Sequence, residues 1–248
     1  MSGEKGPVIR IFPDIQSLSH GAAEVFRTLA RDAVLDHGRF SVALSGGSTP
    51  RELYALLAKE PYCDHIDWQH VHLFWADERC VPPAHDDSNY GMAQELLLSR
   101  VAIPSVNIHR IRGERGAVQA AADYEEELKA YFGEHGYPLL DLVILGVGAD
   151  GHTASLFPGS LQISDHDRRA MPVFSGDQGP DRVTLSLPVL NHAKQALMIA
   201  SGSAKQTVIK HILAEGNPGG VPAGLVRPVT GTVTWFIDRE AAAQLSTR

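Results

Sequence analysis

The stretch LLDLVILGVGADGHTASLFPGS, residues 139–160, contains the pattern that decides how this chain is interpreted. An apolar run of strand length ends in glycines, and His152 stands just beyond them. The glycines Gly146, Gly148 and Gly151 match G-x-G-x-x-G, a dinucleotide-binding pattern that also requires a long following helix. Here Pro158 and Gly159 interrupt any helix after only six residues. The stretch therefore predicts a buried strand followed by a tight turn that presents His152, and it disfavours a nucleotide site.

Short apolar runs and amphipathic segments alternate along the rest of the chain. The runs typical of strands are 8–12, 40–46, 71–77, 107–113, 139–146, 181–187, 195–202 and 233–238. The segments typical of helices are 22–37 (closed by Gly38), 50–60, 89–101, 117–132 and 203–216. This alternation predicts an α/β fold: one domain, residues 1–248, with a mainly parallel Rossmann-like sheet covered by helices on both faces.

The composition limits the possible partners. The formal charge is -7 and no basic run is present, which argues against a nucleic-acid binder but not against binding of a small phosphate. No apolar run reaches the length of a membrane span, and the first ten residues show no apolar signal core. Cys63 and Cys80 suggest no disulfide framework. We expect a cytoplasmic protein that contacts neither membrane nor nucleic acid.

The sequence contains no recognisable metal-binding or serine-hydrolase motif. The twelve histidines are scattered, and His70 and His72, expected on one strand face, have no evident third ligand, so no metal is expected. The sequence lacks H-E-x-x-H and G-x-S-x-G, which disfavours a zinc protease and an α/β-hydrolase serine nucleophile.

In a parallel sheet, ligands bind outside the carboxyl ends of the strands, so the residues that follow each strand are the candidates. After the second strand come Ser45, Gly46, Gly47, Ser48 and Thr49. The glycines allow a sharp turn, and Thr49-Pro50-Arg51-Glu52 is interpreted as a capping box, with Thr49 as N-cap, that opens a helix. Free N–H groups at such a helix start bind anions, although a plain capped turn is the alternative.

Two further groups of charged residues follow strands. Asp77, Glu78 and Arg79 end one strand, where they form either a solvated turn or part of a site. Asp150 and His152 follow another strand at the same predicted edge. A base, carboxylates, a cation and an anion-binding turn together favour acid–base chemistry on a small phosphorylated molecule.

Seven segments in this order resemble one family. They are LSGGSTP (44–50), FWADER (74–79), DDSNYGMA (86–93), LDLVILGVGADGHTASLFPGS (140–160), RVTLSLPVLN (182–191), SGSAK (201–205) and VTWFIDREAAAQL (233–245). The chain, from about residue 8 onward, resembles the 6-phosphogluconolactonase family of the sugar-phosphate isomerase-like α/β type, which is unrelated to the β-propeller lactonases. The related glucosamine-6-phosphate deaminases typically read D-G-H-I-A-F-N-E-P and D-E-Y. This chain has T-A-S-L-F-P after His152 and an arginine at position 79, which favours the lactonase.

The resemblance implies hydrolysis of 6-phosphoglucono-1,5-lactone to 6-phosphogluconate, a step of the pentose phosphate pathway. The mechanism expected for this reaction needs no metal or organic cofactor. It implies that His152 is catalytic and that Arg79, Arg182 and Lys205 line a phosphosugar pocket.

The mechanism that we expect uses His152 as general base on water, with Asp150 orienting it. Asp77 is counted with the candidate catalytic residues. Arg79 or backbone N–H groups would stabilise the oxyanion, and the 45–49 turn, Arg182 and Lys205 would hold phosphate.

Two rival functions stay open: a 6-phosphosugar isomerase or deaminase with Asp77 or Glu78 as base, and a sugar-phosphate sensor without activity. The sequence does not distinguish a monomer from a homodimer.

Overall fold

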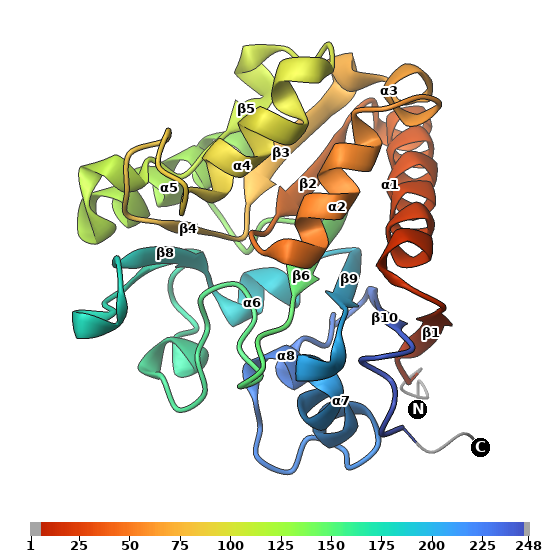
Figure 1. Cartoon of the computed structure of the whole chain (residues 1–248). Helices are drawn as coiled ribbons and strands as arrows, with labels where there is room; N and C mark the ends of the chain where they lie inside the picture. The colour runs from red at the N-terminus through yellow and green to blue at the C-terminus, as the bar shows by residue number, and fades with distance from the viewer. Residues whose placement is uncertain (1–5, 246–248) are drawn as a thin grey trace.

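The computed structural model describes residues 6–245, and its central element is a seven-stranded sheet in which every neighbouring pair of strands is parallel (Figure 1). The strand order is β1-β10-β9-β6-β2-β3-β5. The bounds are β1 Val8–Phe12, β2 Phe40–Leu44, β3 Val71–Trp75, β5 Ile108–His109, β6 Leu142–Gly146, β9 Gln195–Ala200 and β10 Thr232–Asp238. The expected α/β class with a mainly parallel sheet is confirmed.

Helices connect these strands and cover the sheet. Their bounds are α1 Ile15–His37, α2 Ser48–Leu57, α3 Tyr62–His65, α4 Asn89–Leu96, α5 Ala117–Phe132, α6 Leu187–Leu190, α7 Gln206–Leu213 and α8 Pro222–Leu225. Helix α1 packs against α2 and contacts β2 and β10. Figure 1 shows α2 and α1 to the right of β2. Gly38 ends α1 in the left-handed conformation with φ 82°, as its position in the sequence predicts.

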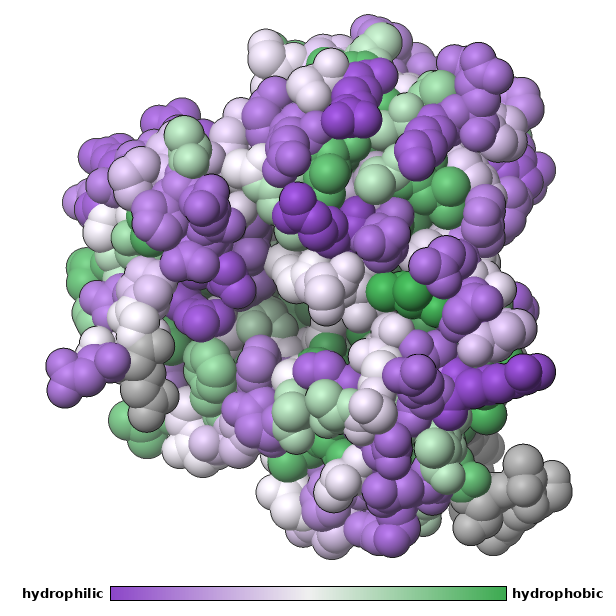
Figure 2. All heavy atoms as spheres, in the orientation of Figure 1, coloured by the Kyte–Doolittle hydropathy of each residue, from purple (hydrophilic) through white to green (hydrophobic). Residues whose placement is uncertain are grey.

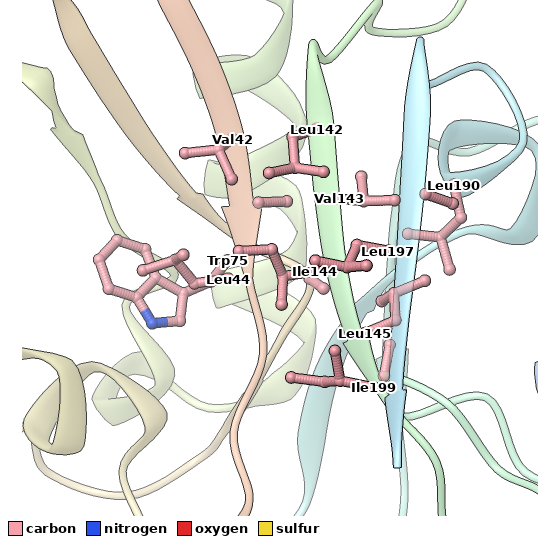
Figure 3. Packing of buried hydrophobic residues seen from close by; sticks show 14 of the residues in the cluster. Val42, Leu44, Trp75, Leu142, Val143, Ile144, Leu145, Leu190, Leu197 and Ile199 are labelled. Carbon is pink, nitrogen blue, oxygen red and sulfur yellow. The ribbon is translucent and has the colours of Figure 1, made fainter. Parts of the chain in front are cut away.

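The core lies around the three central strands β2, β6 and β9. All five residues of β2 are buried, and β6 and β9 are buried over most of their length. Strands in a parallel sheet are covered on both faces, which is why these segments are almost continuously apolar in the sequence. Figure 3 shows Leu44, Ile144 and Leu197 among the side chains that pack together around β6. This packing fixes the carboxyl ends of the strands, and therefore the loops that follow them.

A second, antiparallel sheet departs from the end of β3. It has the order β4-β8-β7, with β4 Asp77–Arg79, β7 Ala170–Val173 and β8 Arg182–Leu185. Ala76 joins the two sheets, because its N–H donates to Leu44 O in the main sheet and its carbonyl accepts from Leu185 N. Figure 1 shows β4 and β8 running side by side, to the left of the main sheet. The segment 181–187 is therefore a strand as predicted, but in this second sheet.

Several predicted boundaries need correction. Helix α2 begins at Ser48 with Gly47 as N-cap and no side-chain cap within the described chain, so Thr49 is not the N-cap and the predicted capping box is wrong. His70 lies in a 3-10 turn, Trp68–His70, and does not share a strand face with His72. The expected strand 107–113 is reduced to β5. The expected helix 89–101 ends at Leu96 and is followed by the separate turn Leu98–Arg100.

Within residues 6–245, no helix has both the length and the apolar character that crossing a membrane requires. The first ten residues are expected to contain no signal sequence, and residues 1–5 of that segment lie outside the described residues.

Candidate active site

A cavity of about 170 Å³ opens at the carboxyl edge of the main sheet, where the second sheet begins. Its walls come from the turn after β2, from β4, from the turn after β6, from β8 and from the segment after β9. The lining residues are Ser45, Gly46, Gly47, Ser48, Thr49, Pro50, Asp77, Arg79, Gly146, Val147, Gly148, His152, Ala154, Arg182 and Lys205. The cavity thus gathers every residue predicted for the lactonase site except Asp150, and it also leaves out Glu78, the alternative base of the isomerase function. Figure 2 shows this face of the molecule hollowed just below the N-terminal end of α2.

The turn after β2 is shaped by glycine. Gly47 has φ 106°, a conformation that side chains rarely adopt. A Cβ added to Gly46 would lie 1.9 Å from Oδ1 of Asn89, so the close approach of these two segments needs glycine. Tyr54 from α2 holds the turn, because its hydroxyl donates to Ser45 O at 2.7 Å and accepts from Ser45 N at 3.1 Å.

This turn has the features of an anion site. Because Gly47 offers no capping side chain, the first N–H groups of α2 are left for a ligand or solvent. Ser45 Oγ is buried and has no hydrogen-bond partner among residues 6–245. Buried hydroxyls are normally paired, so this one is available to a bound group.

The turn after β6 presents His152 with its ring orientation fixed. His152 Nδ1 lies 2.6 Å from Asp150 Oδ1, which also accepts from His152 N at 3.1 Å. The carboxylate requires a donor, so the Nδ1 atom carries the proton and Nε2 keeps its lone pair. A Cβ on Gly148 would lie 2.1 Å from His152 Nδ1, so glycine is needed beside this pair. The arrangement makes the outer nitrogen of His152 a proton acceptor.

Asp150 is held in the ionised form. Partial burial acts to raise the pKa of Asp150, but the hydrogen bonds from His152 and the positive charge that His152 can carry lower the pKa below its ordinary value of 3.8. The His152 ring also packs on Phe157, with 4.9 Å between ring centroids. Asp150 does not line the cavity itself, and its contact with the site runs through His152.

Two arginines face each other across β4 and β8. Arg79 and Arg182 are paired residues of the antiparallel ladder. Arg79 Nη1 donates to Asp87 O at 2.7 Å, and the guanidinium of Arg182 lies 5.4 Å from the ring centroid of Phe157. Burial lowers the pKa of Arg182, and the positive charge of Arg79 lowers it further.

This pair of like charges points to an anion. The buried Nε atoms of both arginines have no hydrogen-bond partner in the described chain. Two adjacent guanidinium groups with unused donors match the geometry and the charge of a phosphate or carboxylate.

Asp77 and Lys205 complete the polar lining. Asp77 is buried, and its carboxylate accepts from Ser155 Oγ at 2.7 Å and from Asn89 Nδ2 at 3.2 Å. Lys205 ends the 3-10 turn Ser203–Lys205, just after β9. The Asp238 carboxylate, which accepts from Gly202 N at 3.1 Å, fixes the start of that turn. Asp77 is therefore a fixed acceptor and Lys205 a half-exposed cation of the same cavity.

The interpretation of residues 77–79 as a solvated turn is wrong, because Asp77 and Glu78 are 4% and 2% exposed. Sequence reasoning also missed Asn89, Ser155 and Phe157 as parts of the site. All three lie in segments that were noted for the family resemblance, but no single-residue signal marks their contacts. Across residues 6–245, His, Cys, Asp and Glu form no group of three with the geometry of a metal site.

Comparison with known proteins identifies the family of this chain. The family model described as glucosamine-6-phosphate isomerases/6-phosphogluconolactonase matches residues 13–235. The human 6-phosphogluconolactonase is 38% identical over 246 residues, covering 97% of this chain and 94% of the human protein. The Haemophilus influenzae 6-phosphogluconolactonase is 38% identical over 207 residues, covering 82% of this chain and 87% of its own length.

A solved structure extends the similarity to the fold. The 6-phosphogluconolactonase from Trypanosoma cruzi superposes with a TM-score of 0.87, at 30% identity and with 97% of both chains covered. This chain belongs to the glucosamine-6-phosphate isomerase/6-phosphogluconolactonase family.

Proposed function

We propose that this chain hydrolyses 6-phosphoglucono-1,5-lactone to 6-phosphogluconate, with His152 as the general base. One observation carries the proposal: His152, whose Nε2 has no hydrogen-bond partner among residues 6–245, shares a small cavity with two arginines whose Nε donors are likewise unpaired within those residues. A base and an anion site in one small cavity suit a small substrate that has a phosphate at one end and an electrophilic carbon at the other. The substrates named for the similar proteins have this chemistry.

The phosphate is held by the turn 45–49 together with Arg182 and Lys205. The helix-start N–H groups and the Ser45 hydroxyl supply neutral donors, and the two side chains supply charge. Fixing the phosphate also fixes the lactone ring relative to His152, so that binding energy is used to orient the reacting carbon.

The hydrolytic step begins when His152 Nε2 takes a proton from water as the water oxygen attacks the lactone carbonyl carbon. The C=O electron pair moves onto the carbonyl oxygen and forms a tetrahedral intermediate. When this intermediate collapses, the bond between that carbon and the ring oxygen breaks, and the imidazolium returns its proton to the ring oxygen. The product is an open-chain acid with a free hydroxyl, and His152 is neutral again.

Two groups are candidates for stabilising the oxyanion: the Arg79 guanidinium and the backbone N–H groups at the glycine turns. Asp150 contributes by fixing the His152 ring and by stabilising the imidazolium that forms during the reaction. Asp77, already held by Ser155 and Asn89, offers a fixed acceptor for a substrate hydroxyl.

We also propose that residues 1–248 form one domain that works in the cytoplasm. The hydrogen bonds of Ala76 to both sheets support the single domain.

The test is a coupled assay in which freshly made 6-phosphogluconolactone is the substrate and 6-phosphogluconate dehydrogenase reports the product. Turnover far above the spontaneous ring opening supports the proposal. Release of ammonia from glucosamine 6-phosphate, without lactone turnover, would instead support the deaminase function.

A further inference from the structure

Glu78 has an unusual place beside the cavity. Along β4 the side chains alternate, so that Asp77 and Arg79 line the cavity while Glu78 does not. Glu78 is nevertheless among the most deeply buried charged residues of the described chain, at 2% exposure. Since burial of a charge is costly, this carboxylate needs a structural or functional reason.

Four donors surround the Glu78 carboxylate. Oε1 accepts from Arg79 N at 2.7 Å and from Asn89 N at 2.8 Å. Oε2 accepts from Tyr90 N at 2.7 Å and from Ser88 Oγ at 3.2 Å. Burial raises the pKa of Glu78, and the three backbone donors act in the opposite direction. The side chain therefore fastens the start of α4 to strand β4.

The segment that Glu78 fastens carries the contacts of two cavity residues. Asp87, immediately before α4, supplies the carbonyl that accepts from Arg79 Nη1 at 2.7 Å. Asn89, whose N–H is held by Glu78, donates through Nδ2 to Asp77 O at 2.9 Å. Asn89 also packs against Gly46 of the anion-binding turn. A shift of residues 87–89 would thus move the Arg79 guanidinium and loosen the wall between β4 and the turn.

We propose that Glu78 is a positioning residue that acts through Arg79: by fixing the start of α4 to β4, it places the Asp87 carbonyl that orients the Arg79 guanidinium toward the substrate. The inference rests on the proposed function, because it assigns Glu78 a part in the same reaction. It also argues against Glu78 as the proton-transferring base of an isomerase, because Glu78 does not line the cavity and both of its carboxylate oxygens already accept hydrogen bonds.

Glu78→Gln tests this role while keeping the side-chain size. The amide nitrogen cannot accept hydrogen bonds, so at least one of the α4 N–H groups loses its partner. We expect kcat/KM for 6-phosphogluconolactone to fall about 10- to 100-fold, the usual effect of losing a residue that orients a functional group. The fall in kcat/KM should be shared between a lower kcat and a higher KM in the same proportion as the fall caused by Arg79→Ala.

A double-mutant cycle separates positioning from general damage. In the Arg79→Ala background, Glu78→Gln should lower kcat/KM less than about threefold, because the guanidinium it positions is already gone. The matched control is Asp141→Asn. Asp141 is also a buried carboxylate that accepts from a backbone N–H, that of Ser41, but it lies at the amino ends of β2 and β6, at the other end of the strands from the cavity. This control should leave both kinetic constants unchanged.

If Glu78→Gln does not fold, as judged by circular dichroism and the melting temperature, Glu78→Asp replaces it. This variant keeps the charge but is one methylene too short to reach both β4 and α4, so the same pattern in the cycle is expected. Wild-type kinetics in a folded Glu78→Gln variant, or equal losses in both backgrounds of the cycle, would overturn the inference. Absence of lactone turnover in the wild type would instead overturn the proposed function.

Discussion

Asp150→Asn is the substitution that most directly probes how His152 is prepared for proton transfer. The asparagine has the size of Asp150, and its amide oxygen can still accept from both His152 Nδ1 and His152 N. The ring orientation is therefore preserved, while the negative charge beside the imidazolium is lost. The variant isolates the electrostatic contribution of Asp150.

The size of that contribution follows from Coulomb's law. Two unit charges about 4 Å apart attract each other by about 1 kcal/mol in water and about 4 kcal/mol at an effective dielectric constant of 20. The side chain of Asp150 is 52% exposed and that of His152 33%, so solvent screens the pair strongly. We expect about 1–2 kcal/mol of lost transition-state stabilisation, which is about a 5- to 30-fold fall in kcat.

The assay measures kcat and KM of Asp150→Asn on 6-phosphogluconolactone, with spontaneous opening subtracted. KM should hardly change, because Asp150 does not line the cavity. Asp165→Asn, which alters a half-buried loop carboxylate that accepts from Arg168 N and does not line the cavity, is the control and should behave as wild type. An unchanged kcat in Asp150→Asn, or a loss that appears only in KM, would refute the assigned role.

Two further predictions concern Arg182 and His72. Arg182→Ala should raise KM for the phosphorylated lactone about 10-fold or more but leave turnover of unphosphorylated gluconolactone unchanged, because only the phosphate loses a charged partner. Equal losses of activity on both substrates would contradict the role of Arg182 in binding phosphate. Burial of His72, together with the nearby His109, lowers the pKa of His72 from 6.5 to about 4. Between these two pH values the unfolded chain binds more protons than the folded chain does, so the folded state loses stability as the pH falls. Because solvent screens this partly exposed group, the free energy of unfolding should fall by about 1 kcal/mol between pH 7 and pH 5 in the wild type, and this loss should be absent in His72→Gln. Urea unfolding of both proteins at the two pH values measures the loss, and an identical pH dependence in both proteins would exclude His72 as its source.

Much of the fold follows from the sequence because apolar periodicity reflects burial. The continuous apolar runs of β2 and β6 are buried on both faces, and helix α5 has the predicted bounds, 117–132. The second sheet was not predictable as a separate unit. Strand β8 was predicted, but its partners β4 and β7 have only three and four residues, too few for a periodic signal.

The capping box failed for a related reason. Thr49-Pro50-Arg51-Glu52 matches the local pattern, but the glycine turn starts the helix at Ser48, so Thr49 lies inside it. The local sequence pattern alone does not specify the residue at which the preceding turn ends and the helix begins.

The candidate site was predictable to the extent that it follows one topological rule. The turns after β2, β3 and β6 meet because the carboxyl ends of parallel strands share an edge. Arg182 and Lys205 were assigned only through the family resemblance. The contacts of Asp77 with Asn89 and Ser155 join residues 12 and 78 positions apart, and no local pattern in one sequence encodes them.

The measurement that tests the central claim most directly compares wild type and His152→Ala in the coupled lactonase assay. The account predicts strong wild-type turnover that collapses toward the spontaneous rate in His152→Ala, while 6-phosphogluconate still binds the variant because its phosphate contacts are intact. Turnover that survives in a folded His152→Ala variant would contradict the assignment of His152 as the base. No turnover in the wild type would contradict the proposed reaction itself.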